Sequence, residues 1–599
     1  MRSSTLLAVL VVALTACSDD ADRLMDPVRS IARADNVPAR TAEPATSWVH
    51  RSDVEVWNES AELDSTFLVG LKAPGQPRGI WEATILVDRR EAEDFKRALA
   101  AQPGVELVRA DPVVPIVLLR ISDFSTLAAI RRLPFVDYVE PHHGRRRAPS
   151  RQEAAAVSRP TLVAPRFSES GSSSPGCSNP DVYTEYGGYT ALGDPYSWSY
   201  TERYNNIVGA WRRSQGDNVR IALIDTGVDS EQPQLTSRFG FTSDATWSRQ
   251  IWYEWVRPSG RSPAWRDDCG HGTRMAGVIA APHDGQNTVG TAWKADLISI
   301  RTDDDVNMRL SESEVADAIH KAMDPWRPAH VIVFAFWSDD DNWVTSLADV
   351  IRYYYYRTDS TGRRNGPLFV GAAGTSSAWD PFVNWNVVFP AEMEEVIAVS
   401  GVNSNRILDD ESHYGPEVDL AGYTPQMTVG VPGVHYQSAL LTSIRGSSGP
   451  TASVGAIAAL VWSRYPHMTN VEVRQRLIWA ALRPQERRSD DGYGPVNAYK
   501  AVGGFSGLAI HGPEFVPPYT TFAVEAVSSG DGPFTYRWNN GATTKRTSYR
   551  STTAGYTVPV RVDVTDTFEG VTRTAYLNVA VQSKPSPNTC DPNVEFCPK

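Results

Sequence analysis

The sequence predicts an α/β fold with a doubly wound, mainly parallel sheet, preceded by a small α+β domain and followed by a β-sandwich. Three observations support this prediction. In the middle of the chain, short runs rich in Val, Ile and Leu are apolar on consecutive residues, which is typical of parallel strands covered on both faces. Upstream, strand-like runs alternate with two helical stretches. Downstream, apolar residues alternate strictly with polar ones.

The parallel sheet is expected within residues 181–505. Its strands should cover 219–224, 297–300, 331–336, 368–372 and 396–399. Helices are expected from 271 onward and over 313–323, 450–465 and 470–482. The helix expected over 450–465 has small or apolar residues on every side, so it should be buried all round.

The small α+β domain is expected over residues 65–143. Its strands should cover 67–71, 83–87, 105–108, 116–121 and 135–139, and its helices 89–101 and 124–133. The first of these helices carries Ala92, Phe95, Ala98 and Leu99 on one face, which is the spacing of an amphipathic helix.

The sandwich is expected over residues 506–582. Val560, Val562 and Val564 alternate with polar residues, and Trp538 follows a Ser/Gly-rich turn. These features predict an immunoglobulin-like β-sandwich. A tail over 583–599 follows it, and no residue in either segment suggests chemistry.

Composition excludes some classes of function. The chain of 599 residues carries a formal net charge of −12 and has no basic face, which argues against a nucleic-acid partner. Neither H-E-x-x-H nor C-x-x-C occurs, so a catalytic zinc site has no support. Four cysteines follow Cys17 and could form disulfides. Cys590 and Cys597 are close in sequence and could pair locally, which would leave Cys177 to pair with Cys269, but all three connectivities remain open.

Residues 1–17 are expected to be a targeting segment. Arg2 precedes an apolar run that is too short to span a bilayer. The ending Leu14-Thr15-Ala16-Cys17 resembles the lipobox of bacterial lipoproteins, which implies acylation of Cys17 and anchoring in the cell envelope, on the periplasmic face or the cell surface. The alternative is an ordinary secretory signal. Either way, the mature protein leaves the cytoplasm.

Two segments are expected to be connections rather than domains. Residues 18–64 are polar and irregular and are interpreted as a tether. Residues 144–180 combine three arginines at 145–147 with a Ser/Gly/Pro-rich run, which is a linker composition. An exposed basic linker is a candidate site of proteolytic cleavage, although a solvated charge cluster is the default interpretation.

Three stretches of the middle domain carry candidate chemistry. An apolar strand ends on Asp225, where open α/β sheets place their sites. His271 lies between two glycines at a helix start. Ser448 follows a Gly-containing turn at the start of the buried helix, where free N–H groups and the helix dipole stabilise negative charge.

Taken together, Asp225-Thr226-Gly227, Gly270-His271-Gly272-Thr273 and Gly446-Ser447-Ser448-Gly449-Pro450 resemble the motifs of the subtilisin family of serine proteases. The order aspartate, histidine, serine is that family's order, and it excludes the α/β-hydrolase order. The resemblance covers most of residues 194–503. It implies an endopeptidase in which Ser448 attacks a peptide carbonyl, His271 transfers the proton and Asp225 orients the imidazole.

The resemblance also implies further roles. The segment 133–141 resembles the end of subtilisin-type propeptides, so residues 65–143 are expected to be an inhibitory pro-region. Ala335, Phe336, Trp337 and Gly374 are expected to line the substrate. The backbone N–H of Ser448 is expected to be one oxyanion donor.

The sequence departs from the family pattern at several positions. Thr375 stands where the family has an asparagine whose side chain is the second oxyanion donor, so partial replacement by its hydroxyl is expected. A family calcium ligand aligns with Gln234, so no metal site is assigned with confidence, although structural calcium is kept as a candidate. The chemistry itself requires no cofactor.

The sequence therefore predicts an exported, lipid-anchored serine endopeptidase made as an inhibited precursor. Its expected partners are protein or peptide substrates, its own pro-region and, through the lipid anchor, a membrane. The alternative is a degenerate relative that binds peptides or surface ligands without cleaving them. The complete triad favours the enzyme. Thr375 and the serine motif, in which Ser447, Gly449 and Ser453 stand where relatives usually have Thr, Met and His, favour the binding protein.

Overall fold

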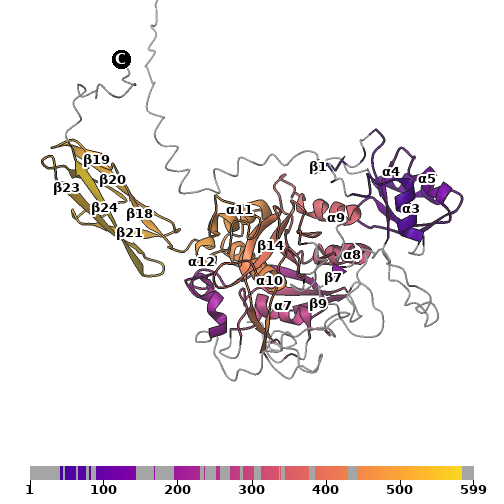
Figure 1. The fold of residues 1–599 in the computed structure, drawn as a ribbon, viewed down its shortest axis with the longest axis horizontal. Coiled ribbons are helices and arrows are strands. Elements are labelled where there is room, and N and C mark those ends of the chain that lie inside the picture. The colour runs from indigo at the N-terminus through magenta and orange to yellow at the C-terminus, as the bar shows by residue number, and fades with distance from the viewer. Residues whose placement is uncertain are drawn as a thin grey trace, which may run out of the picture. The chain divides into compact units, whose positions relative to one another are not determined.

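The computed structural model describes most of the chain in two units, one ending at Val502 and one beginning at Gly503. The described residues are 41–42, 44, 47–61, 65–75, 78, 80–81, 89–142, 167–168, 195–229, 232, 235, 251–255, 267, 270–283, 288–302, 312–335, 337–338, 344–376, 385–429 and 441–582. Figure 1 shows their helices and strands, coloured from indigo near the N-terminus to yellow near the C-terminus.

A seven-stranded sheet forms the centre of the first unit, in the order β15-β14-β13-β11-β8-β10-β9, and every pair in it is parallel. The strands are β8 (Arg220–Asp225), β9 (Ile251–Trp255), β10 (Asp296–Arg301), β11 (Val331–Phe334), β13 (Leu368–Ala372), β14 (Val396–Val402) and β15 (Val418–Tyr423). The predicted mainly parallel α/β fold class is confirmed.

Helices cover both faces of this sheet because alternate residues of its strands are apolar on opposite sides. Ile221 and Leu223 of β8 pack with α7 (His271–Ala280) and α10 (Ser448–Arg464), whereas Ala222 and Ile224 pack with α8 (Glu312–Ala322) and α9 (Thr345–Tyr355). Figure 1 shows α7 and α10 on one side of β14 and its neighbours and α8 and α9 on the other. The sheet is therefore doubly wound.

Shorter elements complete this part of the unit. They are η2 (Pro195–Tyr200), α6 (Ile207–Ala210), α11 (Asn470–Ala480), α12 (Ala498–Ala501), β7 (Phe167–Ser168), β12 (Trp337–Ser338), β16 (Gln426–Val429) and β17 (Leu441–Ile444). Helices α7, α8, α10 and α11 lie where the sequence predicts helices. The prediction omitted α9, β9 and β15, and β11 ends at Phe334, two residues before the expected end.

The first unit also contains an N-terminal subdomain (residues 47–142), built on an antiparallel sheet in the order β4-β5-β2-β6. Its elements are α3 (Asp53–Ala61), β2 (Thr66–Leu71), α4 (Arg89–Ala100), β4 (Val105–Ala110), β5 (Ile116–Ile121), α5 (Phe124–Ile130) and β6 (Val136–Pro141). The short strands β1 (Thr41–Ala42) and β3 (Ile80–Trp81) pair with each other. The strand expected over 83–87 lies outside the described residues.

Helix α3 corrects the expectation of an irregular tether over 18–64. Val56 is fully buried, and Trp57 stacks on Phe67 of β2 at a centroid distance of 6.2 Å. Trp48 belongs to the same apolar cluster. Residues 47–61 are therefore part of the subdomain's core, because their few apolar side chains are enough to close one side of it.

The second unit contains a three-stranded sheet, β18-β20-β22, and a four-stranded sheet, β19-β24-β23-β21. Its strands are β18 (Leu508–His511), β19 (Phe515–Val516), β20 (Thr521–Ser528), β21 (Phe534–Trp538), β22 (Arg546–Arg550), β23 (Thr557–Asp566) and β24 (Val571–Val581). Trp538, Val560, Val562 and Val564 lie in its core, as their alternation predicts.

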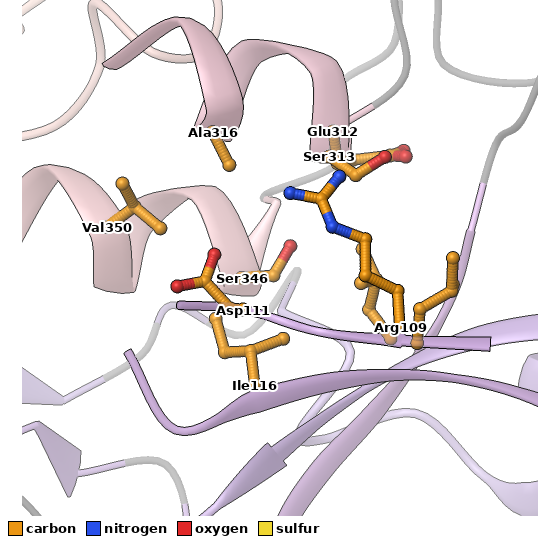
Figure 2. Close-up of a pocket in the computed structure, with 10 residues that line it drawn as sticks. Arg109, Asp111, Ile116, Glu312, Ser313, Ala316, Ser346 and Val350 are labelled. Atoms are coloured by element: carbon orange, nitrogen blue, oxygen red, sulfur yellow. The ribbon is translucent and has the colours of Figure 1, made fainter. Parts of the chain in front are cut away.

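The N-terminal subdomain packs on α8 and α9 through both apolar and polar contacts. Leu68, Ile116 and Leu118 share an apolar cluster with residues of the two helices. The Tyr138 hydroxyl donates to Asp349 at 3.0 Å, and burial followed by the nearby carboxylates raises the pKa of Tyr138. A small pocket remains at this contact, between Arg109 and Asp111 of the subdomain and Ser313 of α8 (Figure 2).

Charged groups close the same contact. Arg109 Nη1 donates to Asp317 Oδ2 of α8 at 2.6 Å, and His320 Nε2 lies 2.9 Å from Asp111 Oδ2. Burial raises the pKa of Asp111, but the hydrogen bonds from His320 and two backbone N–H groups outweigh it, so the pKa is lowered. The carboxylate of Asp111 is therefore held in its charged form.

A further link is Glu140, which acts as the N-terminal cap of α9. Its buried carboxylate accepts the backbone N–H of Thr345 at 3.0 Å and that of Ser346 at 3.3 Å. The N-cap residue Val344 provides no side-chain hydrogen bond of its own. An anion at this position also interacts favourably with the helix dipole.

Candidate active site

Asp225 is the last residue of β8 and lies at the carboxyl edge of the sheet. Its carboxylate is almost completely buried and accepts the backbone N–H of Thr226 at 2.7 Å. His271 Nδ1 lies 3.0 Å from Asp225 Oδ1 and 3.1 Å from Oδ2. With a carboxylate as acceptor, Nδ1 carries the proton, so the neutral ring presents Nε2 as a base.

The start of α7 is pinned so that His271 faces Asp225. The N-cap Gly270 has a φ of 88° and no side chain, and Asp267 supplies the missing acceptor. Its carboxylate accepts the N–H of Gly270 at 2.7 Å and the N–H and hydroxyl of Thr273 at 2.8 and 2.6 Å. A Cβ on Gly272 would lie 2.1 Å from the carbonyl oxygen of Gly227, so the helix approaches the β8 turn as closely as backbone allows.

Ser448 is the first residue of α10, so its backbone N–H has no acceptor within the helix. The Ser448 hydroxyl donates to the carbonyl oxygen of Ala335 at 2.9 Å. Ala335 directly follows β11, which pairs with β8 so that Phe334 lies opposite Ile224. Ser448 is therefore fixed one strand away from Asp225, at the same edge of the sheet.

The turn before Ser448 is held from both sides. Gly446 has a φ of 72°, and a Cβ there would lie 2.5 Å from Cγ2 of Thr375. Arg445 forms ion pairs with Asp409 at 3.2 Å and Asp410 at 3.1 Å. Only glycine fits between these anchors without moving them.

Ser447 and Thr375 form a buried network behind this turn. The Ser447 N–H donates to Thr375 Oγ1 at 3.0 Å, and the two hydroxyl oxygens are 3.0 Å apart. Ser447 Oγ donates to the carbonyl oxygen of Gly374 at 2.8 Å and accepts the N–H of Gly374 at 3.3 Å. The Thr375 hydroxyl, which the sequence suggested as an oxyanion donor, is thus bonded to Ser447.

The structure brings Asp225, His271, Ser448, Thr375 and Ala335 to one edge of the sheet. Gly374 lies there too, with a φ of 126° and a virtual Cβ only 2.5 Å from His413 Nδ1, so it contributes backbone rather than side chain. Cys17, Phe336 and Gln234 lie outside the described residues, and Trp337 is described only as part of β12.

Sequence reasoning overlooked Asp267 and the pair formed by Ser376 and His413. His413 Nδ1 donates to the carbonyl oxygen of Asn386 at 2.8 Å, so Nε2 accepts the Ser376 hydroxyl at 2.7 Å. Asp267 lies three positions before the N-cap Gly270, so it is not at the position where a capping residue is expected. Ser376 and His413 are 37 positions apart, and no local pattern joins them.

Residues 216–495 match the family model described as the subtilase family. The chain contains a subtilase-family domain. The curated relatives agree with this assignment. Thermostable alkaline protease of Halalkalibacterium halodurans is 30% identical over 44% of this chain and 62% of its own length, and Subtilisin NAT of Bacillus subtilis subsp. natto is 29% identical over 44% and 60%.

The chain thus spans about three-fifths of the length of these relatives. Among solved structures, the MycP3 protease from the type VII (ESX-3) secretion system aligns with a TM-score of 0.41 and 24% identity, over 52% of this chain and 90% of that one. Within the described residues, no group of three or more His, Cys, Asp or Glu side chains is arranged to hold a metal ion. No helix in the described ranges has the length and hydrophobicity needed to cross a bilayer.

Proposed function

We propose that this subtilase domain is a serine endopeptidase that hydrolyses peptide bonds through an acyl-enzyme intermediate. The observation that carries the proposal is the two-oxygen contact of Asp225 with His271 Nδ1 at the sheet edge where Ser448 begins α10. A buried aspartate on Nδ1, an unprotonated Nε2 and a serine at a helix N-terminus are what nucleophilic acyl transfer requires.

In the proposed mechanism, Ser448 Oγ gives its proton to His271 Nε2 and attacks the peptide carbonyl. Because a hydroxyl has one proton, Ser448 must first release its bond to Ala335. The resulting oxyanion accepts the backbone N–H of Ser448, which has no acceptor within α10. His271 then protonates the leaving amine, and water hydrolyses the acyl-enzyme by the reverse sequence of proton transfers.

The buried carboxylate of Asp225 stabilises the imidazolium that forms in each half of the reaction, and it also fixes the tautomer. No metal or cofactor is required for these steps. Ala335 is proposed to line the substrate because its carbonyl oxygen lies within hydrogen-bond distance of the nucleophile. Gly374, Phe336 and Trp337 are proposed as further lining positions on the family pattern.

A second part of the proposal is that the N-terminal subdomain is an inhibitory pro-region, removed by cleavage between about 144 and 193. Its support is the contact with α8 and α9, in which Glu140 caps α9 and Arg109 pairs with Asp317. Cleavage by Ser448 itself would make the protein an inhibited precursor. We also propose export with lipidation at Cys17.

A fluorophosphonate probe, which reacts with activated serines, tests the catalytic proposal. Covalent labelling of the processed protein, lost in Ser448→Ala, is the expected result. An unlabelled processed protein would contradict the endopeptidase and would favour the alternative, a degenerate subtilase that binds peptides or surface ligands. That alternative draws support from the engaged hydroxyls of Ser448 and Thr375.

Two measurements test the remaining parts. N-terminal sequencing should find a new terminus between 144 and 193 in the wild type and an intact precursor in Ser448→Ala. An intact precursor in both would contradict self-processing. Metabolic labelling with a radioactive fatty acid should label the wild type but not Cys17→Ser; equal labelling would contradict lipidation at this residue.

A further inference from the structure

The hydroxyl groups of Thr375 and Ser447 have a fixed direction of donation. Ser447 Oγ donates its single proton to the carbonyl oxygen of Gly374 at 2.8 Å, because a carbonyl can only accept. The 3.0 Å contact between the two hydroxyl oxygens then requires Thr375 Oγ1 to be the donor. The only proton of the Thr375 side chain is therefore committed to Ser447.

The acceptor capacity of the same two oxygens is used as well. Ser447 Oγ accepts the N–H of Gly374 in addition to the Thr375 hydroxyl, which fills both of its lone pairs. Thr375 Oγ1 accepts the N–H of Ser447 at 3.0 Å. Ser447 is fully buried and Thr375 is only 8% exposed, so water does not compete effectively for these hydrogen bonds. The network is closed, and breaking any bond leaves a buried polar group unpaired.

This closed network leads directly to the nucleophile. Ser447 is the N-cap of α10, and its N–H is occupied by Thr375, so the first N–H of this turn that is free to point at a substrate oxygen is that of Ser448. The Ser448 N–H lies in the next peptide unit, so its direction depends on the backbone torsions of Ser447. The Thr375 hydroxyl contacts Ser447 at both its N–H and its side chain and thereby restrains these torsions.

We propose that Thr375 is a positioning residue, which orients the oxyanion-binding N–H of Ser448 by bracing Ser447, and that it does not itself donate to the oxyanion. The inference rests on the proposed function, since it concerns the same reaction. It replaces the expectation that the Thr375 hydroxyl is a short substitute for the family's asparagine. The oxyanion site of this domain then depends on a backbone N–H and on the Thr375–Ser447 bond behind it.

The two roles predict different patterns of loss. Removing a direct oxyanion donor costs about 10²–10³-fold in rate and does not depend on Ser447. Removing a brace costs about tenfold, the value of one neutral hydrogen bond, and costs less once the Ser447 hydroxyl is gone, because only the bond from the residue 447 N–H is then left to lose. A double-mutant cycle between Thr375 and Ser447 therefore separates the roles.

The experiment measures the second-order rate of fluorophosphonate labelling of the processed protein, which reports the attack by Ser448. The variants are Thr375→Val, which is nearly isosteric, Ser447→Ala and the double variant. Thr375→Ser restores the hydroxyl, and Thr361→Val is the control because it removes a threonine hydrogen bond, to Asp359, on an exposed loop. We expect about tenfold loss in each single variant, a loss in the double variant that is smaller than the product of the two, recovery in Thr375→Ser and no change in the control.

Two results would overturn the inference. A loss of 10²-fold or more in Thr375→Val with less than twofold in Ser447→Ala would make Thr375 a direct donor. Losses that multiply in the double variant would show that the two residues act independently.

A parallel cycle keeps the inference separate from the catalytic proposal. Chemical denaturation of the same variants in the Ser448→Ala full chain needs no activity. The midpoint should fall in each single variant, and its fall in the double variant should be smaller than the sum of the two, whereas additive shifts would exclude the coupling. Coupled midpoints in a protein whose wild type is never labelled would contradict the endopeptidase but keep the Thr375–Ser447 brace.

Discussion

His271 Nδ1 lies almost equally far from the two carboxylate oxygens of Asp225, at 3.0 and 3.1 Å, although the two residues are 46 positions apart. The contact needs Asp225 at the end of a central strand and His271 at the first residue of a helix. This one relationship fixes which ring nitrogen carries the proton and therefore which one has the lone pair of a base.

Asp225→Asn should lower kcat by about 10⁴-fold with little change in KM, because an amide NH₂ facing Nδ1 stabilises the wrong tautomer. Steady-state hydrolysis of a peptide substrate measures this. Asp359→Asn, in an exposed loop, is the matched control and should retain full activity. A loss of less than tenfold in Asp225→Asn would remove the basis for the proposed mechanism.

Asp267→Ala should lower both stability and kcat, because it leaves the N–H groups of Gly270 and Thr273 without their acceptor at the start of α7. Losing such a cap costs about 1–2 kcal/mol of unfolding free energy. Denaturant titration and kcat are measured on the same preparation. Asp267→Asn, which keeps one oxygen, should lie between the wild type and the alanine variant; equal kcat in all three would mean that the cap does not position His271.

Gly446→Ala should abolish labelling of Ser448, because the new methyl group would lie 2.5 Å from Thr375 at a φ of 72°. Gly362→Ala is a matched control: its φ is 80°, and nothing lies within 4 Å of the new methyl group. Both carry the backbone strain of about 1 kcal/mol, but only the first carries the clash. Circular dichroism should show both variants folded, and similar labelling in the two would exclude the close contact with Thr375.

Glu140→Gln should weaken the hold of the N-terminal subdomain on the subtilase domain by about 2 kcal/mol, because a charged hydrogen-bond acceptor at the start of α9 becomes neutral. The full chain carrying Ser448→Ala is titrated with denaturant, and limited proteolysis follows release of the subdomain. Glu106→Gln removes an exposed ion pair with Arg120 and is the control. Release at the same denaturant concentration in both variants would exclude the cap as a major contact.

His330 should make the stability of the chain depend on pH between about 4 and 6.5. Burial, followed by the charge of Arg220, lowers the pKa of His330 from 6.5 to about 4, and its Nδ1 accepts the backbone N–H of Arg220 at 3.1 Å. In this window the unfolded chain binds a proton that the folded chain does not, so stability rises with pH. The total change is at most about 3 kcal/mol, fully lost below pH 4.

Denaturation at a series of pH values measures this slope in the wild type, in His330→Gln and in His467→Gln, whose histidine is exposed. The slope should become shallower only in His330→Gln. Identical slopes in all three proteins would show that His330 does not contribute.

The strands of the sheet were predictable because each is buried on both faces, so its sequence is apolar without alternation. Helix α10 was predictable for the same reason, although it begins at Ser448, two residues before the predicted start at 450. Helix α9 was not predictable from the local sequence. Its N-terminus is capped by Glu140, more than 200 positions away, and the run Tyr353–Tyr355 has a low helix propensity.

The site shows the same division. Asp225, His271 and Ser448 each lie in a short local motif and can be found from it. The hydrogen bond from the Thr375 hydroxyl to Ser447 cannot be found from a motif, because its direction depends on the Ser447 proton already being donated to Gly374 in the folded chain. Likewise, the sequence of residues 47–61 predicts a polar tether, because the burial of Val56 and the stacking of Trp57 on Phe67 of β2 depend on the folded subdomain.

Three adjacent strands, β13, β11 and β8, each deliver one component to the same edge of the sheet: Thr375, Ala335 and Asp225. Adding one residue inside any of these strands would advance its end by about 3.3 Å and turn the terminal side chain to the opposite face. The interior lengths of these strands are therefore fixed by chemistry, whereas the connections at the amino edge are free to grow. New surface for recognising other molecules can thus be added to this domain at that edge without disturbing the candidate active site.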